Sequence, residues 1–316
     1  MVKMISIVVM ILIVCSCLNI LAKEKVPFLL LDKAPHAYFS EKEVSLVWVK
    51  QSNFPKKYSS LEIRLVYAGR TIKMKRIASG DPIEFKFKLA GLKEGIVAKT
   101  KISLSILDED DQQLRTMTET IYLFASTMSS EYQARLKKIN VGVYAEKDGD
   151  IKMFLEASGI PFQKVDEISD FKGKWLLVAG IDFEDMEGFD KELLTLMDKG
   201  VSVLILATEM KGLFTIPDAS GRLEFLGRDC IKRYEKLLND LYWAKNKKMV
   251  KSKGLLKPLD DTVGIEFSST NKGWSWIEYR KKKARLIFCG WDLLGTYQES
   301  PLASYFLLKV LTNKSK

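Results

Sequence analysis

Several acidic side chains follow short apolar runs in the second half of the chain, where they could take part in catalysis. Asp182, Glu209 and Asp292 each stand a few residues after such a run. Because the carboxyl ends of parallel strands meet at one edge of a sheet, we expect these carboxylates to gather there. Two carboxylates suffice for the hydrolysis of a glycoside. The alternative is that each acid caps the helix that begins in its loop.

Tryptophan side chains accompany these acids near the end of the chain. Trp274 and Trp276 are two positions apart in a short predicted strand, and Trp291 adjoins Asp292. Exposed aromatic faces are good platforms for the apolar C–H surface of a sugar ring. The three tryptophans and the three acids therefore form the predicted ligand site. The alternative is that these rings form a core layer between the sheet and the last helix.

Other kinds of catalysis are limited by the single histidine, His36. A Ser-His-Asp or Cys-His enzyme would have to use that one residue, and a multi-histidine metal site is excluded. We expect Cys230 and Cys289, the two cysteines outside the N-terminal segment, to be thiols rather than a disulfide. No calcium loop and no nucleotide-binding motif is present, so we predict no metal and no cofactor.

Residues 1–22 have the order of a secretory signal. A single early charge, Lys3, precedes the apolar run Ile7–Val14, which is too short to span a membrane. Cleavage after Ala22 is one processing route. In the other, Cys17 stands in a sequence that resembles a bacterial lipoprotein box and would accept a lipid. We expect the chain to be exported and to be periplasmic, secreted or anchored in the envelope.

The composition indicates a folded protein, because 47% of the 316 residues are hydrophobic, and the length suggests about two domains. We place a first domain at residues 23–130, where apolar and polar residues alternate, as in Ile63, Leu65 and Tyr67. Alternation between short turns predicts a β-sandwich of the immunoglobulin or fibronectin type.

The first domain is basic, and the whole chain has a formal net charge of +10. Between Lys50 and Lys101 there are 13 Lys or Arg residues and 4 acids. Such a surface could bind an anionic partner such as a charged glycan. The alternative is that the lysines form the solvated faces of the strands and discourage edge-to-edge association. Because we expect export, we predict no nucleic-acid partner.

We predict a second domain at residues 131–316. Apolar strands near residues 139–144, 175–180 and 201–206 do not alternate, and amphipathic helices separate them. This pattern predicts a three-layer α/β domain with a mostly parallel, flavodoxin-like sheet covered on both faces.

The second domain resembles the class I glutamine-amidotransferase-like domains that are appended to bacterial β-galactosidases and other glycoside hydrolases. The resemblance rests on Gly-Ile-Pro-Phe at 159–162, on the strand end at 179–180, on residues 199–204 and above all on the tail at 284–303. It implies the amidotransferase-like fold and a setting of carbohydrate processing.

The residues of amidotransferase catalysis are missing from this chain. Active members place a cysteine at the turn after the strand that matches residues 201–207, with a histidine and a glutamate from a later loop. This chain has Thr208-Glu209-Met210 at that turn and no histidine in the domain. We therefore lean against an enzyme.

We expect an exported, non-catalytic binding or assembly module, with carbohydrate or another envelope protein as its partner. Membrane attachment would come only through a lipid on Cys17, and the oligomeric state is not predicted. The alternative is a glycosidase-like hydrolase that uses the acids at the strand ends.

Overall fold

The computed structural model describes residues 29–313 with internal gaps. Residues that it does not describe within this range are 32–36, 51–59, 79–82, 109, 127, 146–148, 182, 185, 207–210, 218–220, 227–228, 235–252, 260–261, 269–271 and 299–300. The predicted signal sequence, Cys17 and His36 therefore lie outside the described residues.

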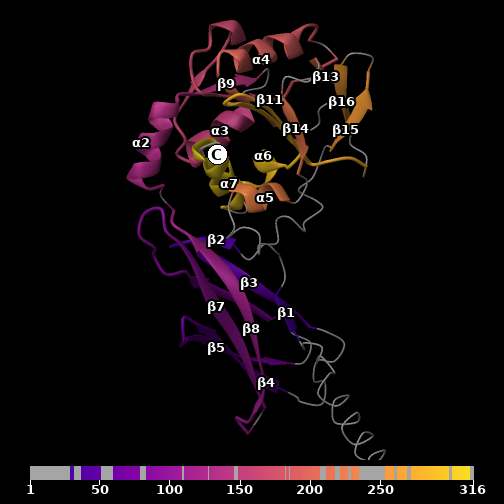
Figure 1. Ribbon diagram of the computed structural model, residues 1–316. Helices are drawn as coiled ribbons and strands as arrows, with labels where there is room; N and C mark the ends of the chain where they lie inside the picture. The colour runs from indigo at the N-terminus through magenta and orange to yellow at the C-terminus, as the bar shows by residue number, and fades with distance from the viewer. Residues whose placement is uncertain are drawn as a thin grey trace, which may run out of the picture. The chain divides into compact units, whose positions relative to one another are not determined.

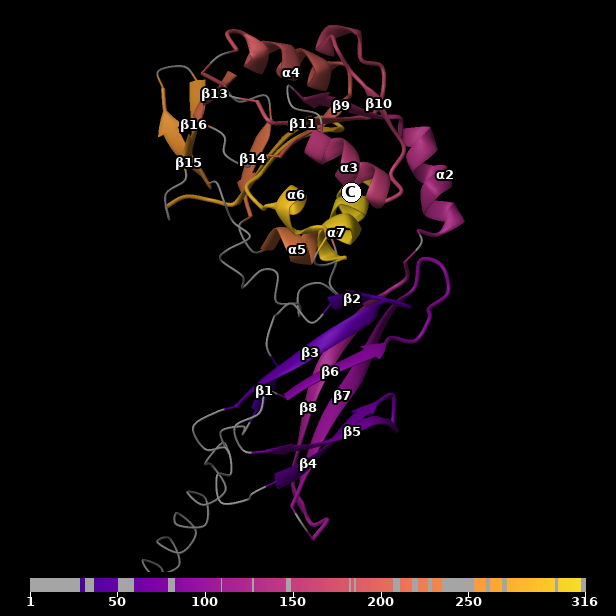
Figure 2. The same cartoon turned by 180° about the vertical axis from the view of Figure 1, so that it is seen from behind.

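The N-terminal part of the chain forms two β-sheets, as the alternating pattern predicts (Figures 1 and 2). The smaller sheet has the strand order β1 (Leu29–Leu31), β3 (Glu43–Lys50), β6 (Ile83–Lys88). The larger sheet has the order β2 (Ala37–Phe39), β8 (Gln113–Phe124), β7 (Val97–Leu107), β4 (Ser60–Tyr67), β5 (Arg70–Ala78). Alternate residues are buried along β3 (Val44, Leu46, Trp48), β6 (Ile83, Phe85, Phe87) and the second half of β7 (Ile102, Leu104, Ile106), so each sheet turns one apolar face inward. The predicted sandwich is confirmed.

The C-terminal part is built on a seven-stranded sheet. Its strand order is β10 (Phe162–Lys164), β9 (Val141–Ala145), β11 (Trp175–Ala179), β12 (Ser202–Leu206), β18 (Ala284–Cys289), β17 (Trp276–Lys281), β14 (Arg222–Phe225). The first five strands are parallel, and the last two are antiparallel to their neighbours. The prediction of a mostly parallel sheet is therefore confirmed.

Two hydrophobic cores lie on the two faces of this sheet. Along β11, Trp175 and Leu177 belong to one core, and Leu176 and Val178 belong to the other. Because both faces are covered, the strand is apolar throughout and does not alternate. The two-sided burial explains why the sequence predicted these strands from continuous apolar runs.

Different elements cover the two faces of the sheet (Figure 1). Helices contribute to the first core: α2 (Ser130–Ile139), α3 (Gly149–Ala157), α5 (Asp229–Tyr234), α6 (Leu293–Thr296) and α7 (Leu302–Thr312). The second core receives α4 (Phe189–Asp198), the short helix η1 (Ile168–Asp170) and two strands of a three-stranded antiparallel sheet. That sheet has the order β13 (Gly212–Pro217), β16 (Thr262–Ser268), β15 (Lys253–Pro258). The α/β layers are thus as predicted, and the small sheet is an addition to them.

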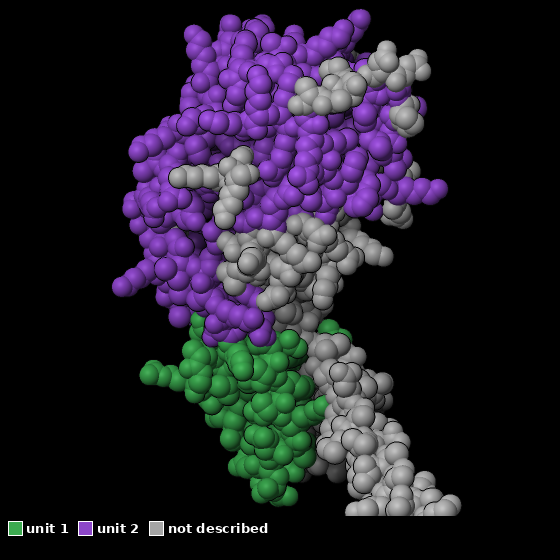
Figure 3. All heavy atoms as spheres, in the orientation of Figure 1, with its two compact units in different colours: residues 1–32, 45–86, 101–119 green, residues 33–44, 87–100, 120–316 purple. Residues whose placement is uncertain are grey.

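The chain divides into two compact units (Figure 3). Unit 1 comprises residues 1–32, 45–86 and 101–119, and unit 2 comprises residues 33–44, 87–100 and 120–316. The ends of several sandwich strands belong to unit 2, and the domain boundary at residue 130 stays a prediction. Within the described ranges, no helix is long and apolar enough to cross a bilayer.

Candidate functional site

Of the three predicted acids, the structure describes Asp292 alone, and it places this side chain at a helix end. Asp292 is the N-cap of α6, and its Oδ1 accepts a hydrogen bond from the Gly295 amide at 2.8 Å. Only 6% of Asp292 is exposed. Asp182 and Glu209 lie outside the described residues. Among the residues that are described, no group of three or more potential metal ligands is found.

The three predicted tryptophans occupy two different environments. Trp276 and Trp291 are buried, and the Trp276 ring packs against Tyr234 and Phe306 at centroid distances of 5.6 and 5.5 Å. Trp274 is 47% exposed and lies against Phe225 at 5.6 Å. Trp276 and Trp291 are thus core residues, and Trp274 alone presents an aromatic face to solvent.

The two cysteines of the α/β fold are not placed to act as nucleophiles. Cys230 and Cys289 are buried thiols. Burial raises the pKa of the Cys289 thiol to about 12, and its Sγ donates to the Trp291 carbonyl at 3.8 Å. A thiolate is the nucleophilic form of cysteine, so this side chain is inert at neutral pH.

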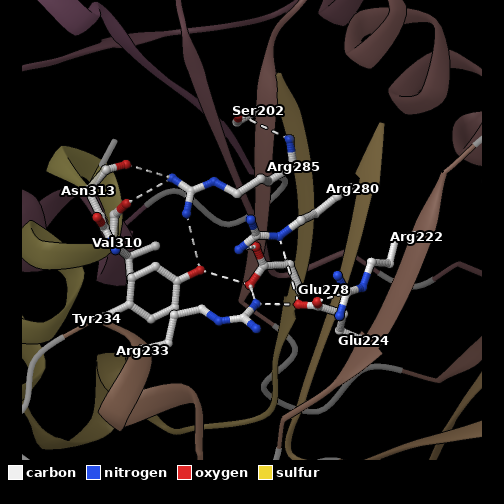
Figure 4. Close-up of polar contacts among 10 residues, drawn as sticks. All are labelled: Ser202, Arg222, Glu224, Arg233, Tyr234, Glu278, Arg280, Arg285, Val310 and Asn313. Carbon is white, nitrogen blue, oxygen red and sulfur yellow. Dashed lines mark hydrogen bonds and ion pairs between the residues drawn. The ribbon is translucent and has the colours of Figure 1, made fainter. Parts of the chain in front are cut away.

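A pair of carboxylates that the sequence did not single out lies at the edge of the seven-stranded sheet (Figure 4). Glu224 of β14 and Glu278 of β17 are directly opposite in the strand register. Arg233 of α5 donates to Glu224 and, at 3.4 Å, to Glu278. Glu278 also accepts from the Tyr234 hydroxyl at 2.9 Å and forms an ion pair with Arg280 at 2.8 Å. Both carboxylates are therefore held by cationic partners.

Three arginines form the next row across the same strands. The register places Arg222 opposite Arg280, and Arg280 opposite Arg285. The Arg285 guanidinium lies over the Trp175 ring at 4.9 Å and donates to the Tyr234 hydroxyl at 3.2 Å. It also donates to the carbonyls of Val310 and Asn313, at 3.3 and 3.1 Å, and so satisfies the carboxyl end of α7. The role of Arg285 is structural.

The electrostatics of this cluster do not suit acid–base catalysis. Burial by itself raises the pKa of Glu224, but the hydrogen bond from Arg233 and the charges of Arg233, Arg222 and Arg280 outweigh it and hold the pKa below its usual range. Burial and Glu278 raise the pKa of Tyr234. A glycosidase needs one carboxylic acid that keeps its proton near neutral pH. Glu224 is ionised under those conditions and cannot be that acid.

Residues of unit 2 line a pocket. It encloses about 560 Å³ of space, open solvent included. It is lined by Phe39, Gly95, Ile96, Val97, Phe124, Ala125, Ser126, Met128, Ser129, Tyr132, Ala157, Ser158, Pro301, Ser304, Tyr305 and Leu308. The lining combines aromatic rings, aliphatic side chains and serine hydroxyls, and none of these residues is charged. Such a lining is typical of small-molecule sites.

Several lining residues are fixed by contacts of their own. The Tyr305 ring of α7 packs edge-on against Phe124 at 5.1 Å. Ser158 donates to the Ser304 hydroxyl at 2.7 Å, which connects the end of α3 to α7. Tyr132 of α2 accepts a hydrogen bond from Lys309 at 3.1 Å. Because α2, α3 and α7 carry these side chains, the pocket walls are held by packed helices.

The fold of the chain is a β-sandwich followed by a three-layer α/β unit with a mostly parallel sheet. A scan of family models found no match, and a search of curated proteins found none either. The fibronectin(III)-like modules of Clostridium thermocellum CbhA match at 17% identity with a TM-score of 0.23, over 32% of this chain and 99% of that chain.

A second solved structure also matches a part of this chain. A family 76 glycoside hydrolase from a bovine Bacteroides thetaiotaomicron strain matches at 12% identity with a TM-score of 0.22, over 34% of this chain and 23% of that chain. The match therefore spans less than a quarter of that hydrolase. Both likenesses concern the fold of a part of the chain and carry no information on ligand or activity.

Proposed function

We propose that this protein is an exported, non-catalytic module that binds carbohydrate in the pocket of unit 2. The observation that carries the proposal is the lining of the pocket, which includes four aromatic residues and four serines and no charged residue. A sugar presents apolar C–H faces and a rim of hydroxyl groups. Aromatic rings pack against the faces, and serine hydroxyls donate to and accept from the rim. The amidotransferase-like resemblance of the sequence, with its setting of carbohydrate processing, supports the same ligand class.

The contacts of the described acids count against the alternative, a glycosidase-like hydrolase. Asp292 caps α6. Glu224 and Glu278 are held in ion pairs with arginines, so this pair is not free to supply an acid and a nucleophile. A hydrolase would have to depend on Asp182 and Glu209, which lie outside the described residues. Binding without turnover is the function that the described part of the chain supports best.

The binding proposal is tested by titrating the full chain with neutral oligosaccharides, namely cellohexaose, mannohexaose and galactohexaose, while sugar release is measured. We expect at least one to bind and none to be cleaved. Tyr305→Ala removes a lining ring, and Ser304→Ala removes a lining hydroxyl; both should weaken binding by roughly tenfold.

The control for the binding test is Met153→Ala, which truncates an exposed apolar side chain of α3 outside the pocket and should leave the affinity unchanged. Equal affinity of wild type and Tyr305→Ala would contradict a role for the pocket. Release of sugar by the wild type that Glu209→Gln abolishes would favour the hydrolase instead.

We also infer export and envelope attachment, from the signal-like sequence of residues 1–22. If Cys17 carries a lipid, the Cys17→Ser variant should move from the membrane fraction to the soluble fraction when the gene is expressed in a bacterium. An unchanged distribution, with cleavage after Ala22 found by mass spectrometry, would support ordinary secretion.

A further inference from the structure

Lysines gather where the parallel strands of the seven-stranded sheet begin. Lys172 and Lys174 precede β11, Lys199 precedes β12, and the hairpin between β17 and β18 carries Lys281, Lys282 and Lys283. Lys281 is half-buried and the other five are exposed. Parallel strands all begin at the same end of their sheet. These three segments, which are far apart in the sequence, therefore reach the same end of the sheet.

Specific contacts join the segments into one surface. Lys281 of the hairpin forms an ion pair with Asp198 at the end of α4 at 2.7 Å. Lys199, which follows α4, donates to the Ser169 carbonyl of η1 at 3.4 Å. The Ser202 amide at the start of β12 donates to the Lys174 carbonyl at 2.9 Å. The three segments therefore contact one another at this end of the sheet, and we call the region that carries their six lysines the basic edge.

The arginine row extends the basic edge across β17 and β14. Arg280 is half-buried, and Arg222 has a side chain that is 79% exposed. The two arginines and six lysines give eight cations. The described carboxylates among them are Asp170, Asp198, Glu224 and Glu278. Four positive charges are therefore in excess among the described residues of this edge.

We propose that the basic edge binds an acidic polysaccharide through its carboxylate or sulfate groups. The cations come from three segments and two strands, so they suit a long ligand with repeated charges better than a single small anion. Lysine ammonium groups act as point charges and do not require one fixed geometry. The large apolar side chains that are exposed elsewhere, such as Trp274 and Leu256, are absent from the described residues of this edge, so the surface lacks the apolar anchors of a protein interface.

The choice of a polysaccharide over other polyanions rests on the proposed carbohydrate-binding function. The basic edge and the pocket are separate sites, because no residue of the basic edge lines the pocket. The pocket has an uncharged lining and would hold a neutral sugar, whereas the basic edge would hold the acidic chain. Each site can therefore be tested without the other.

The test uses the full chain with polygalacturonate as the acidic probe and dextran as the neutral probe. We expect polygalacturonate to bind more tightly than dextran, and we expect its binding to weaken between about 50 and about 500 mM salt, because exposed charges are then screened. The double variant Lys282→Glu/Lys283→Glu should bind roughly tenfold more weakly.

The matched control is Lys152→Glu/Lys191→Glu. It makes the same change of charge at two exposed lysines of α3 and α4, outside the segments of the basic edge. The control should change the affinity by less than about twofold. Equal losses in the two double variants, or equal binding of dextran and polygalacturonate, would overturn the proposal. Binding to vesicles of anionic lipid in the absence of binding to polygalacturonate would also overturn it.

Failure of this inference can be told apart from failure of the proposed function. If cellohexaose or another neutral oligosaccharide binds and polygalacturonate does not, the basic edge is excluded and the pocket stands. If polygalacturonate binds with the expected dependence on Lys282 and Lys283 and no neutral oligosaccharide binds, the pocket is excluded and the basic edge stands.

Discussion

Glu224 and Glu278 lie directly opposite each other on β14 and β17, and Arg233 of α5 donates to both carboxylates. Like charges opposite each other destabilise a pair of strands unless a counter-charge intervenes. The Arg233 guanidinium supplies this positive counter-charge, and it comes from α5, a helix of only six residues. A short helix contributes little stability by itself, so its position depends on tertiary contacts of this kind. The bridge therefore attaches α5 to the edge strand of the sheet.

Removal of the bridging guanidinium should destabilise the fold. In Arg233→Met the two carboxylates would lose one of their two shared cationic partners and would keep Arg280, which lies 3.8 Å from Glu224 and 2.8 Å from the fully buried Glu278. We expect a loss of about 2 kcal/mol in the free energy of unfolding, as for the removal of a charged hydrogen-bond partner. Urea denaturation followed by circular dichroism measures it. Arg222→Met, which removes an exposed partner of Glu224, should cost less than about 1 kcal/mol. Equal losses in the two variants would contradict the bridging role.

The decrease in the free energy of unfolding at acidic pH should depend in part on Glu224. Burial acts to raise the pKa of this carboxyl, but Arg233 and the neighbouring arginines lower it further than burial raises it. A carboxyl whose folded pKa is depressed adds stability above its unfolded pKa of about 4.3, and this stability is lost as the pH falls through the folded pKa. The difference in unfolding free energy between wild type and Glu224→Gln should therefore shrink below about pH 4.

Thermal unfolding between neutral and acidic pH measures this difference. In the Arg233→Met background the same comparison should show a weaker pH dependence, because the foremost attractive partner of Glu224 is gone. A difference that stays constant as the pH falls would refute the assignment.

The two neighbouring tryptophans should respond differently to truncation. Trp276 has 0% exposure and packs on Tyr234 and Phe306, so Trp276→Ala should cost about 3–5 kcal/mol of unfolding free energy. Trp274 is half-exposed, so Trp274→Ala should cost less than about 1.5 kcal/mol. Chemical denaturation of both variants provides the comparison. Comparable losses would mean that Trp274 is also a core residue.

These tryptophans also show where prediction from sequence stops. Residues two apart on one strand share a face, so the single short strand that the sequence predicts would place Trp274 and Trp276 side by side. In the structure Trp276 begins β17 of the seven-stranded sheet, whereas Trp274 pairs with Gly254 of the small sheet. The chain changes sheets between the two positions, so the period of the strand does not connect them.

The sequence pattern predicted the strands correctly where a residue's type depends only on whether the residue is buried. The apolar runs of β11 and β12 predicted a doubly covered sheet because each of these strands is buried on both faces. The carboxylate bridge was not predictable, because it depends on the register between β14 and β17 and on the packing of α5. The pocket was missed for a similar reason. Its lining comes from several segments, and no single one has a distinctive pattern.

The reactivity of Cys289 tests whether the α/β unit holds an activated sulfur nucleophile. Burial raises the pKa of this thiol to about 12. Cys289 is the last residue of β18 and belongs to the first hydrophobic core. Iodoacetamide reacts with thiolates, so at about pH 8 the native protein should leave Cys289 unlabelled, whereas an ordinary thiol with a pKa of about 8.5 is partly ionised. Mass spectrometry of the peptide that contains Cys289 measures the extent of labelling.

An internal standard makes the labelling experiment quantitative. Met153 is 51% exposed on α3, so Met153→Cys places a solvent-accessible thiol in the same molecule. We expect this cysteine to be labelled under native conditions and Cys289 to be labelled only after denaturation. If Cys289 reacted in the native state as fast as the cysteine at position 153, the thiol would be accessible and ionised. The sheet would then hold a competent nucleophile, and the non-catalytic proposal would have to be abandoned.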